Sequence, residues 1–319
     1  MTTLKGGFRK YMGKIAFLFD GQGSQYAGMG KELFEEVGQV HDFYGVAEAI
    51  RPGTLSQMFE GSEEELKKTE NTQPCLFLAD IAAALALIEK GVNPDAVAGF
   101  SLGETVAMAV SGALSKEQAF KLVCKRGKLM QKAAEAQEGS MIAVLKMNKN
   151  ELKEICEKIG VYPVNYNCPG QIVVSGAVEK IEELKEELKA QNVRFIELPV
   201  GGPFHTPYMK EASEGLKNEL ELNKIYNINK TYIPLYANKT AMPYTAEKEE
   251  MIDTFSEQIS NSVQWEETLL NMAKAGVDTF IECGPGKTLS GFVKRTVPGA
   301  KILNVSDIET LNKTVEEVC

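Results

Sequence analysis

The chain has 319 residues, of which 44% are hydrophobic and 25% are charged, a composition typical of a globular protein with one or two domains. A net charge of −9 argues against nonspecific binding to nucleic acid, because phosphates attract basic surfaces. The longest apolar run, residues 81–88, is too short to cross a membrane, and the first 13 residues lack the apolar core of a secretory signal. The six cysteines form no C-x-x-C pair and no metal-binding spacing, which indicates a reducing cytoplasm.

A first strand is expected over residues 14–19, and a glycine-rich loop, Gly21-Gln22-Gly23-Ser24-Gln25, follows it. A dinucleotide-binding loop would need a third glycine where this chain has Tyr26, so that interpretation is disfavoured. We expect instead a loop whose backbone lies close to a reacting group, with Gln22 supplying an amide. Helices are expected around residues 30–38 and 73–90.

The most informative segment is Gly99-Phe100-Ser101-Leu102-Gly103, which lies between two predicted elements. A short apolar strand precedes it, and apolar residues recur at helical spacing from Leu102 to Ala113. In this context G-x-S-x-G is typical of a nucleophile elbow, in which the flanking glycines allow a tight turn. The free N–H groups at the start of the helix can bind a developing oxyanion, so Ser101 is the candidate nucleophile.

A helix is expected from residue 116 to about residue 137. Four lysines form one stripe along it, a pattern that is usually a solvated face: Lys121, Lys125, Lys128 and Lys132. Arg126 is offset from this stripe by about 100° and therefore faces the apolar side of the helix. A buried arginine needs a carboxylate partner, which can be a glutamate of the protein or the anionic end of a substrate.

The pattern changes over residues 139–200, where strands are expected at 141–145, 161–165, 171–175 and 193–200 and helices at 149–159 and 178–191. This β-α-β-β-α-β order is that of a ferredoxin-like unit. We therefore expect residues 14–138 and 201–319 to form a large α/β subdomain, with strands at 233–237 and 279–282, and residues 139–200 to form a small inserted one. Residues 1–13 are expected to be a loosely held extension, and the active site is expected in the cleft between the subdomains.

Only two histidines are available to act as a base for Ser101. His205 lies in a loop rich in glycine and proline directly after a predicted strand, whereas His41 lies in a polar stretch without such residues, so His205 is the candidate base. No aspartate lies between Ser101 and His205, and the glutamates there fall mostly in helices with a solvent-facing pattern. A Ser-His dyad with a neutral group orienting the imidazole fits better than a hydrolase triad.

Taken together, six segments resemble the family of malonyl-CoA:acyl carrier protein transacylases, in the family's order and over about residues 14–307. They are Gly21-Gln22-Gly23-Ser24-Gln25, Gly99-Phe100-Ser101-Leu102-Gly103-Glu104, Lys125-Arg126-Gly127-Lys128-Leu129-Met130-Gln131, Phe204-His205, Asn261-Ser262-Val263-Gln264-Trp265 and Glu282-Cys283-Gly284-Pro285-Gly286. The resemblance implies an α/β-hydrolase-like large subdomain with an inserted ferredoxin-like small one.

The resemblance also implies a role for each of six residues: Ser101 as nucleophile, His205 as base, the N–H groups of Gln22 and Leu102 as oxyanion hole, Arg126 as partner of the malonyl carboxylate, and the main-chain carbonyl of Gln258 as the group that orients the histidine. One position departs from the family, because Phe100 stands where a histidine usually precedes the serine. This change makes one wall of the acyl pocket apolar and bears on acyl selectivity and hydrolysis. Phe204 resembles the malonyl-selecting residue at its position and would crowd a substrate with an α-methyl branch.

The implied reaction is a ping-pong transfer from malonyl-CoA to Ser101 and then to the phosphopantetheine thiol of acyl carrier protein, for fatty acid biosynthesis. It needs no metal or redox cofactor. The expected partners are malonyl-CoA and acyl carrier protein, with no nucleic acid and no membrane, and the protein is expected to be a cytoplasmic monomer.

Three alternatives remain open. An acyltransferase that serves a polyketide synthase would use the same chemistry with another carrier partner. An editing hydrolase that removes stalled acyl groups would gain nothing from Arg126. A non-catalytic carrier-protein adaptor, which Phe100 could indicate, would not need Ser101, His205 and Arg126 together.

Two basic patches are candidates for docking an acidic carrier protein, because the overall charge of this chain opposes the encounter. One is the lysine stripe of residues 121–132, and the other consists of Lys287, Lys294 and Arg295. The second is preferred, since a loop at the rim of the site lies nearer the serine than the outward face of a helix does.

Overall fold

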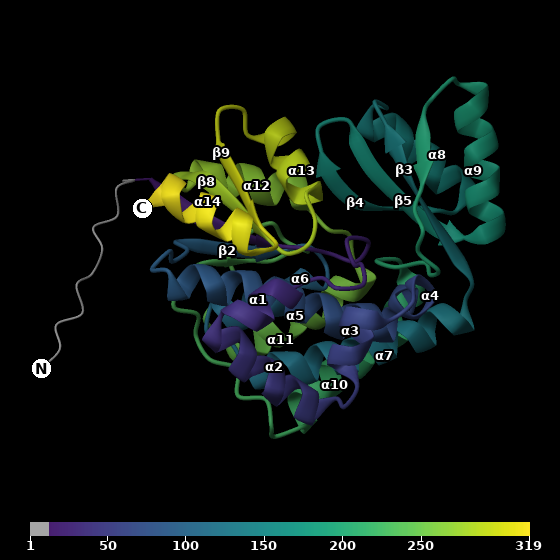
Figure 1. Cartoon of the computed structure of the whole chain (residues 1–319). Coiled ribbons are helices and arrows are strands. Elements are labelled where there is room, and N and C mark those ends of the chain that lie inside the picture. The colour runs from purple at the N-terminus through teal and green to yellow at the C-terminus, as the bar shows by residue number, and fades with distance from the viewer. Residues whose placement is uncertain (1–12) are drawn as a thin grey trace, which may run out of the picture.

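The structure is a computed structural model that describes residues 13–319, so the predicted extension over residues 1–13 lies outside the described residues except for Gly13. The described chain forms a large subdomain around a parallel sheet and a small subdomain around an antiparallel sheet (Figure 1). This arrangement confirms the predicted fold class, an α/β-hydrolase-like large subdomain with an inserted ferredoxin-like small one.

The five-stranded sheet of the large subdomain has the order β7-β2-β1-β8-β9, and its pairings are parallel. Its strands are β1 (Lys14–Phe19), β2 (Ala96–Gly99), β7 (Leu235–Tyr236), β8 (Val277–Cys283) and β9 (Lys301–Val305). Phe19 is in register with Gly99 of β2 and with Cys283 of β8. The carboxyl ends of three strands therefore meet at one edge, which is where sheets of this kind bind ligands.

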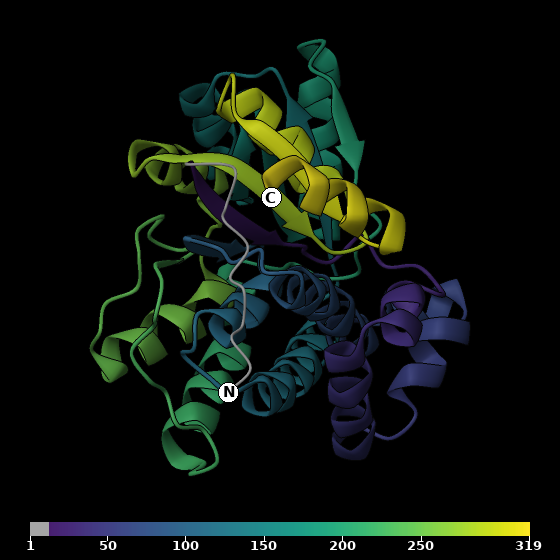
Figure 2. The same ribbon diagram turned by 60° about the vertical axis from the view of Figure 1, so that its left-hand side comes forward.

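Helices cover both faces of this sheet. The larger layer packs on the face of the sheet that carries Ile15 and Phe17. Its helices are α1 (Lys31–Glu36), α2 (Gly38–Ile50), α3 (Thr54–Glu60), α4 (Glu63–Lys67), α5 (Thr69–Glu89), α6 (Gly103–Val110), α7 (Lys116–Ala136), α10 (Lys210–Leu222), α11 (Lys248–Glu257) and α14 (Ile308–Val318). On the opposite face, Ala16 and Leu18 pack with α12 (Trp265–Lys274) and α13 (Thr288–Thr296). Figure 2 shows the sheet between the two layers. The alternation along β1 follows from the two-residue period of a strand.

In the described chain, α5 alone is long and apolar enough to cross a membrane by length and composition. Within the protein, 89% of its apolar window is buried. A helix that is apolar on all sides and enclosed by other elements is typical of the core of a large domain.

The small subdomain is a four-stranded antiparallel sheet with the order β4-β5-β3-β6. Its elements follow the predicted sequence: β3 (Gly139–Leu145), α8 (Lys149–Ile159), β4 (Tyr162–Cys168), β5 (Gln171–Ala177), α9 (Val178–Ala190) and β6 (Phe195–Glu197). The last strand was expected over residues 193–200 and is shorter. It ends shortly before Pro199, which has no N–H to continue a ladder.

The two subdomains are joined along β4, which lies beside the chain between α11 and α12. The N–H of Tyr166 donates to the carbonyl of Val263 at 2.9 Å, and the N–H of Val263 donates to Val164 at 2.7 Å. The two segments that connect the small subdomain to the large one also lie side by side. A Cβ atom added at Gly139 would lie only 2.5 Å from the backbone nitrogen of Pro203. These contacts place the small sheet over the carboxyl edge of the large one (Figure 1).

Candidate active site

Ser101 lies in the turn between β2 and α6 with φ = 54°, a left-handed conformation that residues other than glycine rarely adopt. A Cβ at Gly99 would lie 1.9 Å from the backbone of Gly103, and one at Gly103 would lie 2.4 Å from the carbonyl oxygen of Phe19. Only glycine fits at both positions, so the motif's glycines permit the turn. The side-chain oxygen of Asn238 accepts from the N–H of Ser101 at 2.7 Å and holds the turn in place.

His205 meets Ser101 directly, with the serine Oγ 2.9 Å from Nε2. Nδ1 faces two main-chain carbonyl oxygens, of Gln258 at 3.0 Å and of Asn261 at 3.1 Å. Two acceptors at Nδ1 require the hydrogen there, so Nε2 is left to accept from the serine hydroxyl. Burial, and then the positive charge of Arg126, lowers the pKa of His205 to about 4, so the imidazole is neutral near pH 7.

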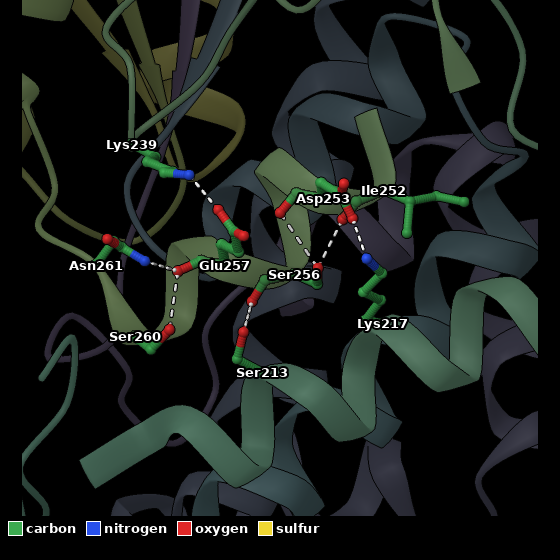
Figure 3. A network of polar contacts seen from close by, with 9 residues as sticks. All are labelled: Ser213, Lys217, Lys239, Ile252, Asp253, Ser256, Glu257, Ser260 and Asn261. Carbon is green, nitrogen blue, oxygen red and sulfur yellow. Dashed lines mark hydrogen bonds and ion pairs between the residues drawn. The ribbon is translucent and has the colours of Figure 1, made fainter. Parts of the chain in front are cut away.

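The segment that carries these two carbonyl groups is fixed by polar contacts around the end of α11 (Figure 3). Ser213 of α10 donates from its hydroxyl to the carbonyl of Ser256 at 2.8 Å. Asn261 donates from its side chain to the carbonyl of Glu257 at 2.8 Å, and Lys239 pairs with the carboxylate of Glu257. The short helix η2 (Gln258–Ser260) is therefore held at both ends, which keeps the two carbonyl oxygens aimed at the imidazole.

Arg126 of α7 is 1% exposed, and its Nη2 lies 3.2 Å from the Oγ of Ser101. Nη1 donates to Gln73 of α5 at 2.8 Å, and Nη2 donates to the side-chain oxygen of Gln258 at 2.8 Å. Nε has no hydrogen-bond partner among the described residues. Burial lowers the pKa of Arg126 to about 10, against the opposing effect of the Glu104 carboxylate. A guanidinium with an unused donor beside a nucleophile is suited to bind a carboxylate.

Sequence reasoning missed three buried side chains of this site: Gln73, Glu104 and Asn238. Glu104 accepts from Gln258 at 2.7 Å, from the backbone N–H of Asn238 at 3.3 Å and from the hydroxyl of Tyr244. Burial raises the pKa of Glu104 to about 7. Its position directly after the G-x-S-x-G motif was the one available signal. No local pattern marks Gln73 or Asn238, because they arrive from α5 and from the loop after β7.

The glycine-rich loop after β1 packs against the serine turn. A Cβ atom added at Gly21 would lie 2.7 Å from the ring of Phe100. The backbone N–H of Phe100 donates to the carbonyl oxygen of Phe19 at 2.9 Å. In residues 13–319 no acceptor is found for the backbone N–H of Gln22 or of Leu102. Two unused N–H groups beside a nucleophile have the chemistry of an oxyanion hole.

A pocket opens beside Ser101, and both subdomains contribute to its wall: Gln22, Phe100, Met130, Phe204 and His205 from the large one and Met141, Asn165, Leu198 and Val200 from the small one. The ring of Phe100 also packs 5.3 Å from Trp265 and 6.3 Å from Phe292, centroid to centroid. This contact fixes Phe100 as part of the core under α12 and α13 as well as of the pocket wall. The mainly apolar lining suits a short acyl chain.

No group of three or more His, Cys, Asp or Glu side chains that could hold a metal ion is found in the described part of the chain. The six cysteines are free thiols. His41, the histidine that was set aside, stacks on Phe34 with a centroid distance of 4.8 Å, in the helical layer.

Comparisons with known proteins agree with this geometry. The model of the acyl transferase domain family matches residues 16–314. A malonyl CoA-acyl carrier protein transacylase of Bacillus subtilis strain 168 is 42% identical over 96% of this chain and 97% of its own. The solved structure of such an enzyme from Clostridium perfringens has a TM-score of 0.90 at 40% identity, covering 95% of this chain and 96% of its own. A malonyl-transacylase solved in complex with its type II polyketide acyl-carrier protein has a TM-score of 0.90 at 32% identity, covering 95% and 99%. The chain belongs to the acyl transferase domain family.

Proposed function

We propose that this chain transfers the malonyl group from malonyl-CoA to the phosphopantetheine thiol of acyl carrier protein, by way of a malonyl ester on Ser101. The observation that carries the proposal is one cluster, in which the Oγ of Ser101 lies 2.9 Å from Nε2 of His205 and 3.2 Å from Nη2 of Arg126. A nucleophile, its base and a cation for a carboxylate converge on one point. The activity named for the similar proteins, malonyl transfer to acyl carrier protein, supports the same reaction.

In the first half-reaction, Nε2 of His205 takes the proton of the Ser101 hydroxyl as Oγ bonds to the thioester carbonyl carbon. The electron pair moves to the carbonyl oxygen, which the backbone N–H groups of Gln22 and Leu102 stabilise. When this intermediate collapses, the carbon–sulfur bond breaks and the departing coenzyme A sulfur takes the proton from His205. In the second half-reaction, Nε2 of His205 takes the proton of the carrier thiol as its sulfur bonds to the ester carbonyl carbon. The bond between that carbon and Oγ of Ser101 then breaks, and Oγ takes the proton from His205.

The malonyl carboxylate is selected by Arg126, whose Nε has no partner in the described chain and whose Nη2 already faces the serine. An acetyl group lacks this carboxylate and gains nothing from the guanidinium. Phe204 lines the same pocket and is 5% exposed, so an α-methyl branch would meet its ring.

Acyl carrier protein is the proposed macromolecular partner, and the complex of a similar transacylase with its carrier protein supports it. Every step drawn above uses only groups of this chain and the two thiols, so no cofactor is required.

The free cysteines support the cytoplasm as the proposed location. A monomer suffices, because both subdomain walls of the pocket come from one chain.

The test is intact-protein mass spectrometry after brief exposure to malonyl-CoA. The wild-type protein should gain one malonyl group, and Ser101→Ala should gain none. Ser140→Ala, which removes a partly exposed serine of the small sheet, should be labelled like the wild type. Labelling that persists in Ser101→Ala would exclude this serine as the nucleophile.

A further inference from the structure

Among the described residues, two neutral amides and no carboxylate form hydrogen bonds with the guanidinium of Arg126. Gln73 accepts from Nη1 and Gln258 accepts from Nη2, each at 2.8 Å. These three side chains are at most 1% exposed. The carboxylate that acts on the pKa of Arg126 belongs to Glu104, and it lies one amide further away, bound to the side-chain nitrogen of Gln258 at 2.7 Å.

The amide of Gln258 has only one orientation that fits this position. Its nitrogen donates to Glu104 and to the main-chain oxygen of Ser101, both at 2.7 Å, while its oxygen faces Arg126. Turning the amide over would set its oxygen against the carboxylate and its NH₂ against the guanidinium. Glu104 therefore fixes the amide, and the amide separates Glu104 from Arg126.

Gln73 has no comparable constraint that requires an amide. Its oxygen faces Arg126, and within residues 13–319 its nitrogen meets only the sulfur of Met130, at 3.2 Å. A glutamate would fill the same space and would form an ion pair with the guanidinium, and this pair would be stronger than the present hydrogen bond to a neutral amide. Because both partners of this pair would belong to one molecule, the carboxylate of a substrate would have to displace the carboxylate of the protein before it could bind Arg126.

We propose that the neutrality of Gln73 and Gln258 is a determinant of acyl selectivity, because it holds Arg126 in place without occupying it by a carboxylate of the protein. The inference rests on the proposed function, in which Arg126 binds the malonyl carboxylate. It assigns Gln73 as a positioning residue that acts through Arg126. It also gives the side chain of Gln258 a role distinct from that of its main-chain carbonyl, which faces His205.

The test compares two variants of Gln73 that are close in size, Gln73→Glu and Gln73→Met. The rates of Ser101 labelling by malonyl-CoA and by acetyl-CoA are measured by intact mass. Gln73→Glu should raise the malonyl-CoA concentration needed for half-maximal labelling by roughly tenfold to a hundredfold and change that for acetyl-CoA by less than about threefold. Gln73→Met stays neutral but removes the acceptor of Nη1, so it should lose part of the malonyl-over-acetyl preference, and clearly less of it than Gln73→Glu.

A merely structural role for Gln73 would move both variants and both substrates alike. The inference is therefore overturned if Gln73→Glu keeps the wild-type preference, or if Gln73→Met loses it equally. Should Gln73→Glu fail to fold, Gln258→Glu combined with Glu104→Gln also places a carboxylate on Arg126 at constant net charge and should lose the preference. Failure of the proposed function is distinct, since it would appear as an absence of malonylation in the wild-type protein.

Free malonate gives a second readout that does not depend on acyl transfer. It should protect wild-type Ser101 from a neutral fluorophosphonate, and protection of Gln73→Met should need less additional malonate than protection of Gln73→Glu. Gln73→Glu should need roughly tenfold more malonate for the same protection. Equal protection in all three proteins would contradict the inference.

Discussion

At the scale of single residues, we expect the guanidinium of Arg126 to discriminate between a carboxylated and an uncarboxylated acyl group. Arg126→Ala should lose most malonyl transfer and retain acetyl transfer relatively better, because the guanidinium contributes only when a carboxylate is present. Loss of a buried charge-assisted pair corresponds to roughly 2–4 kcal/mol, tens- to several-hundred-fold in rate. Transfer rates with both thioesters measure the effect, and Lys128→Ala on the exposed face of α7 is the control. If a folded Arg126→Ala protein lost malonyl transfer and acetyl transfer equally, the role of Arg126 would be structural.

The pH dependence of Ser101 reactivity reports on the imidazole. A histidine acts as a base only when neutral, so we expect reactivity to be lost as the pH falls through the pKa of His205, which burial and the charge of Arg126 lower to about 4. Labelling by a neutral fluorophosphonate should therefore be level from pH 8 to pH 5 and fall to half near pH 4. In Arg126→Gln the midpoint should move to a higher pH, because a repelling positive charge is removed. Circular dichroism at each pH checks the fold, and a wild-type midpoint near pH 7 would contradict this account.

The sequence predicts those site residues whose placement depends on the residues directly beside them in the chain. Ser101 follows from its flanking glycines, and Arg126 from its phase on an amphipathic helix. Gln73 and Asn238 could not be found this way, because each reaches the site only through the packing of its element. Glu104 sits next to the motif, yet its burial depends on Tyr244 and other residues far along the chain.

At the scale of elements, we expect α13 rather than α7 to meet a carrier protein. The guanidinium of Arg295 lies 5.6 Å from the ring of Phe292, which packs 6.3 Å from Phe100, next to the nucleophile. Figure 1 shows α13 beside β4 at the junction of the subdomains. On α7, Lys125 of the lysine stripe pairs with Glu219 of α10 at 3.4 Å. The patch of Lys287, Lys294 and Arg295 is the stronger docking candidate.

Reversing Lys294 and Arg295 to glutamate should slow malonyl transfer to acyl carrier protein by about three- to tenfold and flatten its salt dependence, because steering by opposite charge is lost. Labelling of the enzyme by malonyl-CoA should be unchanged. Both half-reactions are measured over a range of ionic strengths. The matched control reverses Lys121 and Lys128, which are exposed on α7. If only the control variant slows the transfer, the docking face is the lysine stripe.

Elements with strong end signals were predictable to the residue. The helix expected over residues 149–159 is α8 (Lys149–Ile159), which Asn148 caps from its side chain and Gly160 ends at φ = 88°. The strand expected over residues 233–237 is reduced to β7 (Leu235–Tyr236), since Pro234 lacks an N–H. β9 and the helices of the last hundred residues were not predicted. β9 is only partly buried for most of its length and gives a weak apolar signal.

At the scale of the whole molecule, three buried carboxyl groups lie together where β1, α5 and β8 converge: Asp20, Asp80 and Glu282, each at most 1% exposed. The N–H of Gly286 donates to Asp20 at 2.6 Å, and the N–H groups of Leu289 and Ser290 donate to Glu282. Among the described residues, the carboxylate of Asp80 has no side-chain hydrogen-bond partner, and its pKa is lowered only by the backbone N–H of Asp20. Burial first, and then the neighbouring carboxyl groups, raises the pKa of Asp80 well above its ordinary value, as burial also does for Asp20.

Because the pKa of Asp80 is higher in the folded than in the unfolded protein, its contribution to stability is complete below about pH 4 and is lost as the pH rises towards the folded pKa. Asp80→Asn cannot ionise, so it should raise the free energy of unfolding at pH 8 by about 1–3 kcal/mol and have a smaller effect at pH 5. Thermal unfolding at both values measures this, at roughly 2–4 °C per kcal/mol. Asp42→Asn, at an exposed position of α2, is the control and should leave the pH dependence as it is. An Asp80→Asn protein that loses stability between pH 5 and pH 8 as steeply as the wild type would show that the charge is carried elsewhere in the cluster.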